Sequence, residues 1–427
     1  MEGADLKLKN IFIFKTITVI ATMIMLGYTL LLPAGFSSLS FEKTIVIVLG
    51  IILSGIVLLE ANHDQKLRNK IKIASRYIIV YLVIIIFEIL NSLNRYNYDT
   101  HSMISVLIPF GSIFFALPIV YIFYKDKTSV NFLWIISAFE FVMILIRSIS
   151  WFFYNFKSRL IFPRLVFQYG SWQRNGLQRI EPSILFGIIV IFWIYIFLKS
   201  NKNLLFLFPS LFMIVYLIFV SQVRFQTIIS LLAIVSMIYY FYNKKKNSSF
   251  VKVLIIAMIL ILIISGFLSS IISTFSIGNV EYGDSTTARF DGINHYFEII
   301  REQGAYFRGL GFLNDTNSVV LNLVSRNAWS EYYLDDLGII GGLIEFGLMS
   351  VVLYGYLFYI SFKTCYNVYR KKEYQKFSFL FAVMIYMVVS CLILNIFDPQ
   401  RAFDVPYYLA IFSFYNNGGS EEDIEVE

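Results

Sequence analysis

Long apolar runs alternate with short polar segments along the whole chain. We predict membrane-spanning helices near residues 11–32, 44–59, 77–93, 103–124, 132–152, 183–198, 204–221, 225–242, 251–272, 338–360, 377–396 and 406–416. Apolar runs of roughly 17–25 residues are long enough to cross a hydrocarbon core about 30 Å thick as helices. The last run is short, so eleven spans is the alternative count.

Composition supports this pattern. The chain is 58% hydrophobic and 15% charged, whereas soluble domains average about 45–50% and about 25%. The expected fold class is all-α, a polytopic helical bundle in a membrane. We expect one bundle over residues 1–416, with two larger outer loops near 153–182 and 273–337. The acidic segment 417–427 is predicted to be a disordered cytoplasmic tail.

The lysines set the predicted topology. Alternate connections are rich in lysine, as in "NHDQKLRNKIKIASR" and "NKKKNSS". Positively charged loops stay in the cytoplasm, so both termini are predicted to be cytoplasmic. Seventeen of the 20 lysines then lie inside, but 12 of the 15 arginines lie in outer loops or at outer ends of spans.

Arginine outside the membrane calls for a separate explanation. Its planar fork of donors binds phosphate and carboxylate groups bidentately, whereas lysine acts as a point charge. The excess therefore favours an external anionic substrate. Scattered ion pairs and contacts with lipid headgroups are the alternative.

The first outer loop mixes basic and aromatic residues. "YNFKSRLIFPRLVFQYGSWQRNGLQRIEPS" contains Arg164, Arg174 and Arg179. Beside a membrane this mixture fits a lipid-linked pyrophosphate or an acidic sugar better than a nucleic acid. An interfacial aromatic belt is an equally acceptable interpretation.

A short outer turn and the second loop hold the other candidates. The turn "FVSQVRFQT" carries one charge, Arg224, and snorkelling to headgroups would also explain it. Residues 289–303 are predicted to form a helix with Phe290, Ile293, Phe297 and Ile300 on its apolar face.

The other face of this helix places His295 one turn from carboxylates on both sides. That arrangement suits a general acid or base, although an exposed, salt-bridged surface explains it as well. The following "FRGLGF" sets Arg308 beside two glycines, where the backbone could approach an anion or simply turn.

The order of these motifs resembles the O-antigen polymerase/ligase family of bacterial envelopes. A short turn with "SQVR" is followed by two spans, a large outer loop with "ARFDGINHYFEIIREQGAYFRGLGF", and an asparagine and acid-x-glycine before a helix. The likeness covers residues 204–360 in detail. The individual motifs are short, so their order and topology carry it.

The resemblance implies glycan transfer from a polyprenyl-pyrophosphate carrier at the outer face of the bacterial cytoplasmic membrane. Arg224 would match the pyrophosphate-binding arginine of the short turn. Arg289 would match the arginine that opens the loop helix, and Asp336 the acid before the next span. Flippase and chain-length regulator proteins would be its partners, beside membrane lipids and lipid-linked oligosaccharides.

One departure distinguishes polymerase from ligase. Many ligases carry a histidine-asparagine pair where this chain has Arg326 and Asn327, so the usual candidate base is missing. This favours a polymerase and leaves His295, or no base, as alternatives. Departure of pyrophosphate could be assisted by arginines alone.

We therefore expect a polysaccharide polymerase. Arg224, Arg289 and His295 are the catalytic candidates, and the substrate-binding candidates are Arg164, Arg174, Arg179, Arg308, Arg326 and Asp336. No metal, cofactor or nucleic acid is implied.

Two rival functions remain. A glycosyltransferase using polyprenyl-monophosphate sugars needs acids in an early outer loop, where Glu42, Asp99 and His101 are the candidates. A transporter or flippase would use the intramembrane charges Lys15, Glu88, Glu140, Arg147 and Glu345. The lack of a visible inverted repeat argues against it.

Overall fold

A computed structural model describes most of the chain. The described residues are 2–33, 39–168, 170, 172–200, 203–242, 283–314, 317–327, 330–332, 334–398 and 401–416. The predicted span 251–272 and the predicted tail 417–427 lie outside these ranges.

The first half is a series of helices that mostly follow the predicted spans. They are α1 (Glu2–Met25), η1 (Tyr28–Leu31), α2 (Leu39–His63), α3 (Gln65–Tyr96), α4 (Thr100–Leu107), η2 (Pro109–Phe115), α5 (Ala116–Lys125), α6 (Val130–Lys157) and α7 (Pro163–Val166). Asp64 separates α2 from α3 because its side chain accepts the backbone N–H groups of Lys66 and Leu67 and caps α3. The predicted span 103–124 is not one helix, since it is divided where Pro109 begins η2.

The second half contains helices and two small hairpins. The elements are β1 (Gln173–Arg174), β2 (Leu177–Gln178), α8 (Phe186–Lys199), α9 (Leu204–Tyr216), η3 (Leu217–Ser221), α10 (Arg224–Tyr242), α13 (Gly283–Glu302), α14 (Ser318–Val324), β3 (Ser325–Asn327), β4 (Ser330–Glu331), η4 (Leu334–Leu337), α15 (Ile339–Phe346), α16 (Met349–Arg370), α17 (Tyr374–Ser390), η5 (Ala402–Asp404) and α18 (Val405–Asn416). Both hairpins are antiparallel.

The predicted span 338–360 is also two helices. Gly347 has a positive φ of 55° between α15 and α16. An added Cβ there would lie 2.4 Å from the backbone nitrogen of Gly309. Only glycine allows this conformation together with this close contact, so the chain bends where the second outer loop packs against it.

Three helices form the centre of the bundle. Side chains on all faces of α5 and α8 are buried, and so are those of α18 up to Tyr415. α18 packs against α16, α5 and α3. The shortest predicted span is therefore a helix enclosed by other helices, which explains why it has no polar face.

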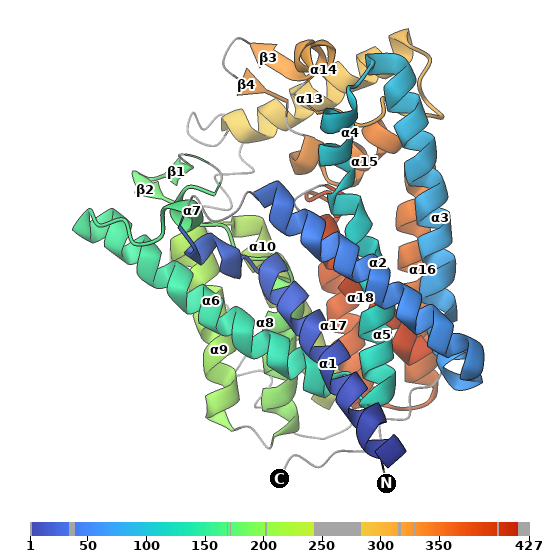
Figure 1. Cartoon of the computed structure of the whole chain (residues 1–427). Helices are drawn as coiled ribbons and strands as arrows, with labels where there is room; N and C mark the ends of the chain where they lie inside the picture. Colours follow the sequence, from blue (N-terminus) through green and yellow to red (C-terminus); the bar gives the residue numbers. More distant parts are fainter. Residues whose placement is uncertain are drawn as a thin grey trace.

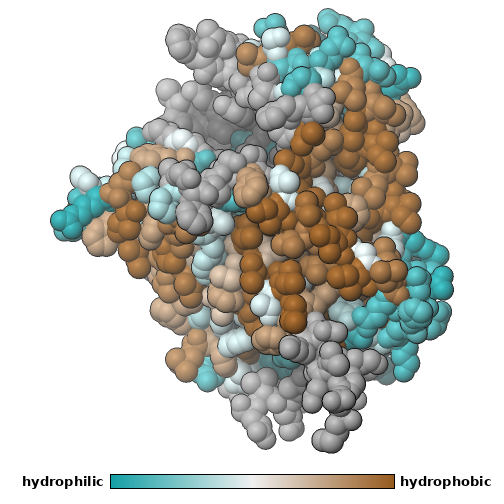
Figure 2. Space-filling model, viewed as in Figure 1, coloured by the Kyte–Doolittle hydropathy of each residue, from teal (hydrophilic) through white to brown (hydrophobic). Residues whose placement is uncertain are grey.

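The surface of the bundle is consistent with a membrane protein. Among the described residues, five helices are long and apolar enough to cross a membrane: Phe41–His63, Gln65–Tyr96, Val130–Lys157, Leu204–Ser221 and Arg224–Tyr242. Shorter apolar helices accompany them within the described ranges. Large apolar side chains stay exposed along α2 and α3, and Figure 2 shows a broad hydrophobic surface between hydrophilic patches. The prediction of an all-α helical membrane protein is confirmed, and the number of membrane spans stays a prediction.

The two ends of the bundle differ in charge. Ion pairs of lysine join Lys15 to Asp126 and Lys125 to Glu60, both at 2.5 Å. At the same end Lys70 donates to the carbonyl of Phe414, near the end of α18, at 3.2 Å. This lysine end is at the bottom of Figure 1, and α13, α14, β3 and β4 cover the opposite end.

The α13 helix is rotated from the predicted orientation. Phe290 and Phe297 are 64% and 43% exposed, whereas Tyr296 and Ile300 are buried. The hydroxyl of Tyr296 donates to the carbonyl of Tyr332 at 2.6 Å. The helix is thus held by Tyr296 and Ile300, and Phe290 and Phe297 of the predicted apolar face are exposed.

Candidate functional site

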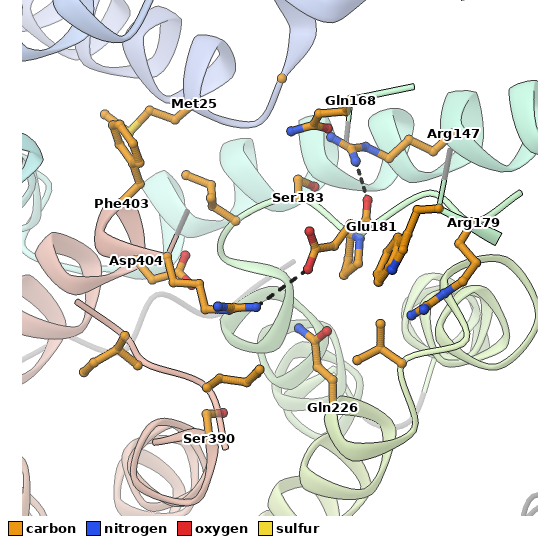
Figure 3. Close-up of a pocket in the computed structure, with 18 of the residues that line it drawn as sticks. Met25, Arg147, Gln168, Arg179, Glu181, Ser183, Gln226, Ser390, Phe403 and Asp404 are labelled. Carbon is orange, nitrogen blue, oxygen red and sulfur yellow. Dashed lines mark hydrogen bonds and ion pairs between the residues drawn. The ribbon is translucent and has the colours of Figure 1, made fainter. Parts of the chain in front are cut away.

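A cavity of about 450 Å³ opens between the predicted outer segments. Its charged lining comes from distant parts of the chain: Lys43, Arg147, Arg174, Arg179, Arg224, Arg289 and Arg401 are the cations, and Glu42, Glu181, Asp336 and Asp404 are the acids. Apolar residues of α1, α2 and the 393–396 segment complete the wall. Figure 3 shows Glu181, Asp404 and Gln226 around this space. The surplus of cations makes it suited to an anion with an apolar group attached.

The hairpin β1–β2 lies on the short turn that precedes Arg224. Nη1 of Arg174 donates to the carbonyl of Gln222, and Nε of Arg179 to that of Ser221, both at 2.7 Å. These bonds satisfy carbonyls where α9 ends in the π-helical turn η3. The first loop and the short turn therefore meet, which places Arg224 at the cavity with its two neighbours.

The sequence carried a signal for this hairpin. Asn175 and Gly176 connect the strands with φ values of 53° and 72°. Asn-Gly between two strands is the strongest short-range indication of a two-residue hairpin. The charges of the loop give no indication of this hairpin, whereas the Asn-Gly dipeptide does.

Arg179 is fixed on two sides. Its guanidinium lies 3.4 Å from the ring centroid of Trp172, a cation–π contact. Burial, with the charges of Arg174 and Arg224 nearby, lowers the pKa of Arg179 to about 9. The side chain still carries its charge at neutral pH, so the cavity keeps a buried cation.

Arg289 and Asp336 lie close to each other. Nη2 of Arg289, on α13, lies 3.9 Å from Oδ2 of Asp336, on η4. Within the described ranges, the buried Nε of Arg289 has no hydrogen-bond partner. Both side chains line the cavity, and an incoming anion would supply an acceptor for that donor.

The segment 181–183 is attached to α6 at two points. Arg147 donates to the carbonyl of Glu181, and Ser183 donates to the carboxylate of Glu140. Arg147 and Glu140, the two intramembrane charges of α6, thus both bond to the segment 181–183. Figure 3 shows the contact of Arg147 with Glu181 and the carboxylate of Glu181 turned toward the cavity.

Several cavity residues were not predicted as site residues. Arg401 is one of the 12 predicted outer arginines and has no predicted role, and Arg147 is a candidate only in the transporter alternative. Arg401 lies 3.9 Å from Glu181 and 3.7 Å from Asp398. Glu181 and Asp404 had no signal in the sequence, because single acids beside arginines are common on ordinary surfaces.

Arg164 and Arg308 are not among the residues that line the cavity. Arg164 bonds Glu42 and the carbonyl of Thr29, both at 2.9 Å, and so holds a lining residue from behind. Arg308 is exposed. Arg326 belongs to β3. Their roles in substrate binding stay predictions.

His295 is engaged in packing the second loop. Its Nε2 lies 2.7 Å from the carbonyl oxygen of Leu323, and its ring centroid is 4.8 Å from that of Tyr332. It is not among the residues that line the cavity. This position links α13 to α14.

The glycines of "FRGLGF" also have structural partners. The N–H of Gly309 donates to the carbonyl of Ala305, and that of Gly311 to Glu345. The first bond closes a turn within the loop. The Gly311 bond, with that from the N–H of Leu310 to the carbonyl of Ile344, docks the loop on α15, so the geometry favours a packing turn over an anion-binding loop.

Within the described ranges no three His, Cys, Asp or Glu side chains gather as a metal site. Among known proteins, no family model matches the chain, and no curated protein matches it either.

Proposed function

We propose that the protein is a polysaccharide polymerase of the bacterial cytoplasmic membrane. It would transfer a growing glycan from polyprenyl pyrophosphate to a lipid-linked repeat unit at the outer face. A hydroxyl of the acceptor sugar attacks the anomeric carbon of the donor, and the lipid pyrophosphate leaves.

The observation that carries this proposal is the convergence of Arg174, Arg179, Arg224 and Arg289 on one cavity. They come from the first outer loop, the short turn and the second outer loop. Guanidinium groups bind pyrophosphate oxygens bidentately and stabilise the charge that develops on the leaving group. The apolar part of the wall suits the first isoprene units of the carrier.

Three of the five intramembrane charges that would support a transporter make bonds within the protein. Lys15 pairs with Asp126, Glu140 accepts from Ser183, and Arg147 donates to backbone carbonyls. A transport path would need such groups to be available to a cargo near the midplane. This arrangement favours the polymerase.

The test is polymerisation by the purified protein. We expect lipid-linked repeat units, extracted from cells in which the gene is deleted, to be converted to a ladder of longer chains. Arg224→Ala and Arg289→Ala should each reduce this synthesis at least 100-fold, as expected for the loss of one transition-state donor.

Lysine substitutions and a control sharpen this test. Arg224→Lys and Arg289→Lys should restore little activity, because the fork of donors is lost. Arg301→Ala is the matched control, since Arg301 is exposed on the same helix as Arg289. Full-length product from the alanine variants would refute their assignment.

A further inference from the structure

The cavity holds a carboxylate that the proposed reaction has not used. Glu181 lines the cavity with a side chain that is 23% exposed. Its nearest charged partner is Nη2 of Arg401 at 3.9 Å, which is too long for a hydrogen bond. Within the described ranges, no donor is hydrogen-bonded to its carboxylate oxygens.

The other three acids of the lining are placed differently. Glu42 accepts bonds from Arg164 and Thr29, one at each oxygen. Asp404 accepts the backbone N–H of Leu185 at 2.7 Å. Asp336 is 50% exposed and faces Arg289. Among these four acids, only Glu181 is partly buried and also accepts no hydrogen bond at its carboxylate from any described donor.

The backbone of Glu181 is firmly held. Its carbonyl accepts from Arg147 and from the hydroxyl of Tyr216, the latter at 3.3 Å. Pro182 follows and restricts the conformation of the preceding residue. The hydroxyl of Ser183, one residue further on, is bonded to Glu140. A side chain carried by such a segment is pre-organised relative to whatever binds in the cavity.

The surrounding charges suit proton transfer. Burial raises the pKa of Glu181, opposed by the positive charges of Arg401, Arg179 and Arg147, and supported by Asp336. A carboxylate with a raised pKa is a stronger base than an exposed one. Of these three, Arg179 also belongs to the cavity arginines proposed to hold the donor pyrophosphate, with Arg174, Arg224 and Arg289.

We propose that Glu181 is the general base of glycosyl transfer in this protein. This assignment rests on the proposed function. A carboxylate oxygen of Glu181 accepts the proton of the attacking sugar hydroxyl as its oxygen bonds to the anomeric carbon. The bond from that carbon to the pyrophosphate oxygen breaks, and its electron pair leaves with the pyrophosphate. A single displacement of this kind inverts the anomeric configuration.

The test separates binding from chemistry. Glu181→Gln should bind glycan-free polyprenyl pyrophosphate within about threefold of wild type, while polymerisation falls by 10²–10⁴-fold, the usual contribution of a general base. Glu181→Asp covers the case in which the amide variant fails to fold, and it should retain part of the rate. Glu302→Gln, an exposed carboxylate at the end of α13, is the matched control and should polymerise normally.

Two further measurements are specific to a base. Added formate should restore part of the rate of Glu181→Ala, because a small carboxylate can occupy the space and accept the proton. Nuclear magnetic resonance of the product linkage should show inversion relative to the donor.

Each contrary result has its own meaning. Glu181→Gln retaining a tenth or more of the rate, or losing pyrophosphate binding as well, would overturn the assignment of the base. Retention of configuration would do the same, since it would make Glu181 a nucleophile or an onlooker. A wild-type protein that forms no ladder would overturn the proposed function and this assignment together.

Discussion

At the scale of single residues, the arginines of the cavity divide into two kinds. Arg174 and Arg179 bond the carbonyls of the turn at Ser221 and Gln222. Arg289 has a donor that no described residue accepts. The first kind builds the site as well as contributing its charge to it, and the second has an open donor placed to meet a ligand. The same residue type therefore contributes stability at one position and binding at another.

His295 gives a prediction at this scale. Its ring nitrogen lies 2.7 Å from the carbonyl oxygen of Leu323. His295→Ala should remove one hydrogen bond and cost about 1 kcal/mol of stability. If this link is its whole role, chain lengths of the polymer should stay near normal. Gel analysis of the polymer checks this, and loss of long chains in a folded variant would return His295 to the catalytic candidates.

At the scale of elements, close backbone contacts at glycines fix the second outer loop and α15. Gly338, between η4 and α15, has φ 60° and ψ −136°. An added Cβ would lie 2.5 Å from the carbonyl oxygen of Cys391, at the end of α17. Gly338 is the glycine of the acid-x-glycine motif that begins at Asp336, and these contacts are the physical reason for a glycine there.

Gly338→Ala should therefore destabilise the protein. Backbone strain costs roughly 1–3 kcal/mol and overpacking a similar amount, so we expect a clearly lower Tm in detergent. Gly355→Ala in α16 is the control. Nothing lies within 4 Å of an added Cβ there, and alanine is the better helix former by about 0.5–1 kcal/mol. Equal Tm values for the two variants would contradict the role of Gly338.

The loop before α18 supplies a pH prediction. Burial raises the pKa of Asp404 to about 7. Between about pH 4 and pH 7 the folded state keeps a proton on Asp404 that the unfolded state releases. The free energy of unfolding therefore falls as the pH rises through this interval, and the whole loss of stability remains above about pH 7. The stabilisation by Asp404→Asn should be larger at pH 8 than at pH 5 by roughly 2–3 kcal/mol.

Thermal unfolding at the two pH values measures this difference. Glu302→Gln, which alters an exposed carboxylate, should show none of it. A gain from Asp404→Asn that is the same at pH 5 and pH 8 would mean that the carboxyl keeps one protonation state across this interval.

At the scale of the whole molecule, the coarse features were predictable and the precise site was not. Apolar runs predicted most helices, since burial in lipid or protein requires them. The asymmetry of lysine and arginine predicted an anionic substrate at one face of the membrane, because charge is a property of composition and topology. The role proposed for Glu181 could not be predicted from the sequence. It depends on the other acids of the cavity having hydrogen-bond partners or greater exposure, which only the fold determines. The packed face of α13 depended on Tyr332, which comes much later in the chain.

The separation of lysine and arginine also makes a prediction about orientation. If lysine-rich loops stay in the cytoplasm, the cavity opens on the outer face. Glu302→Cys near the cavity end should react with a membrane-impermeant maleimide in intact spheroplasts. Lys372→Cys, exposed after α16, should react only after permeabilisation. Both native cysteines are buried, so the parent protein provides a low background. The reverse labelling pattern would place the arginine cavity in the cytoplasm, where lipid-linked repeat units are made rather than polymerised, and would exclude the proposed reaction.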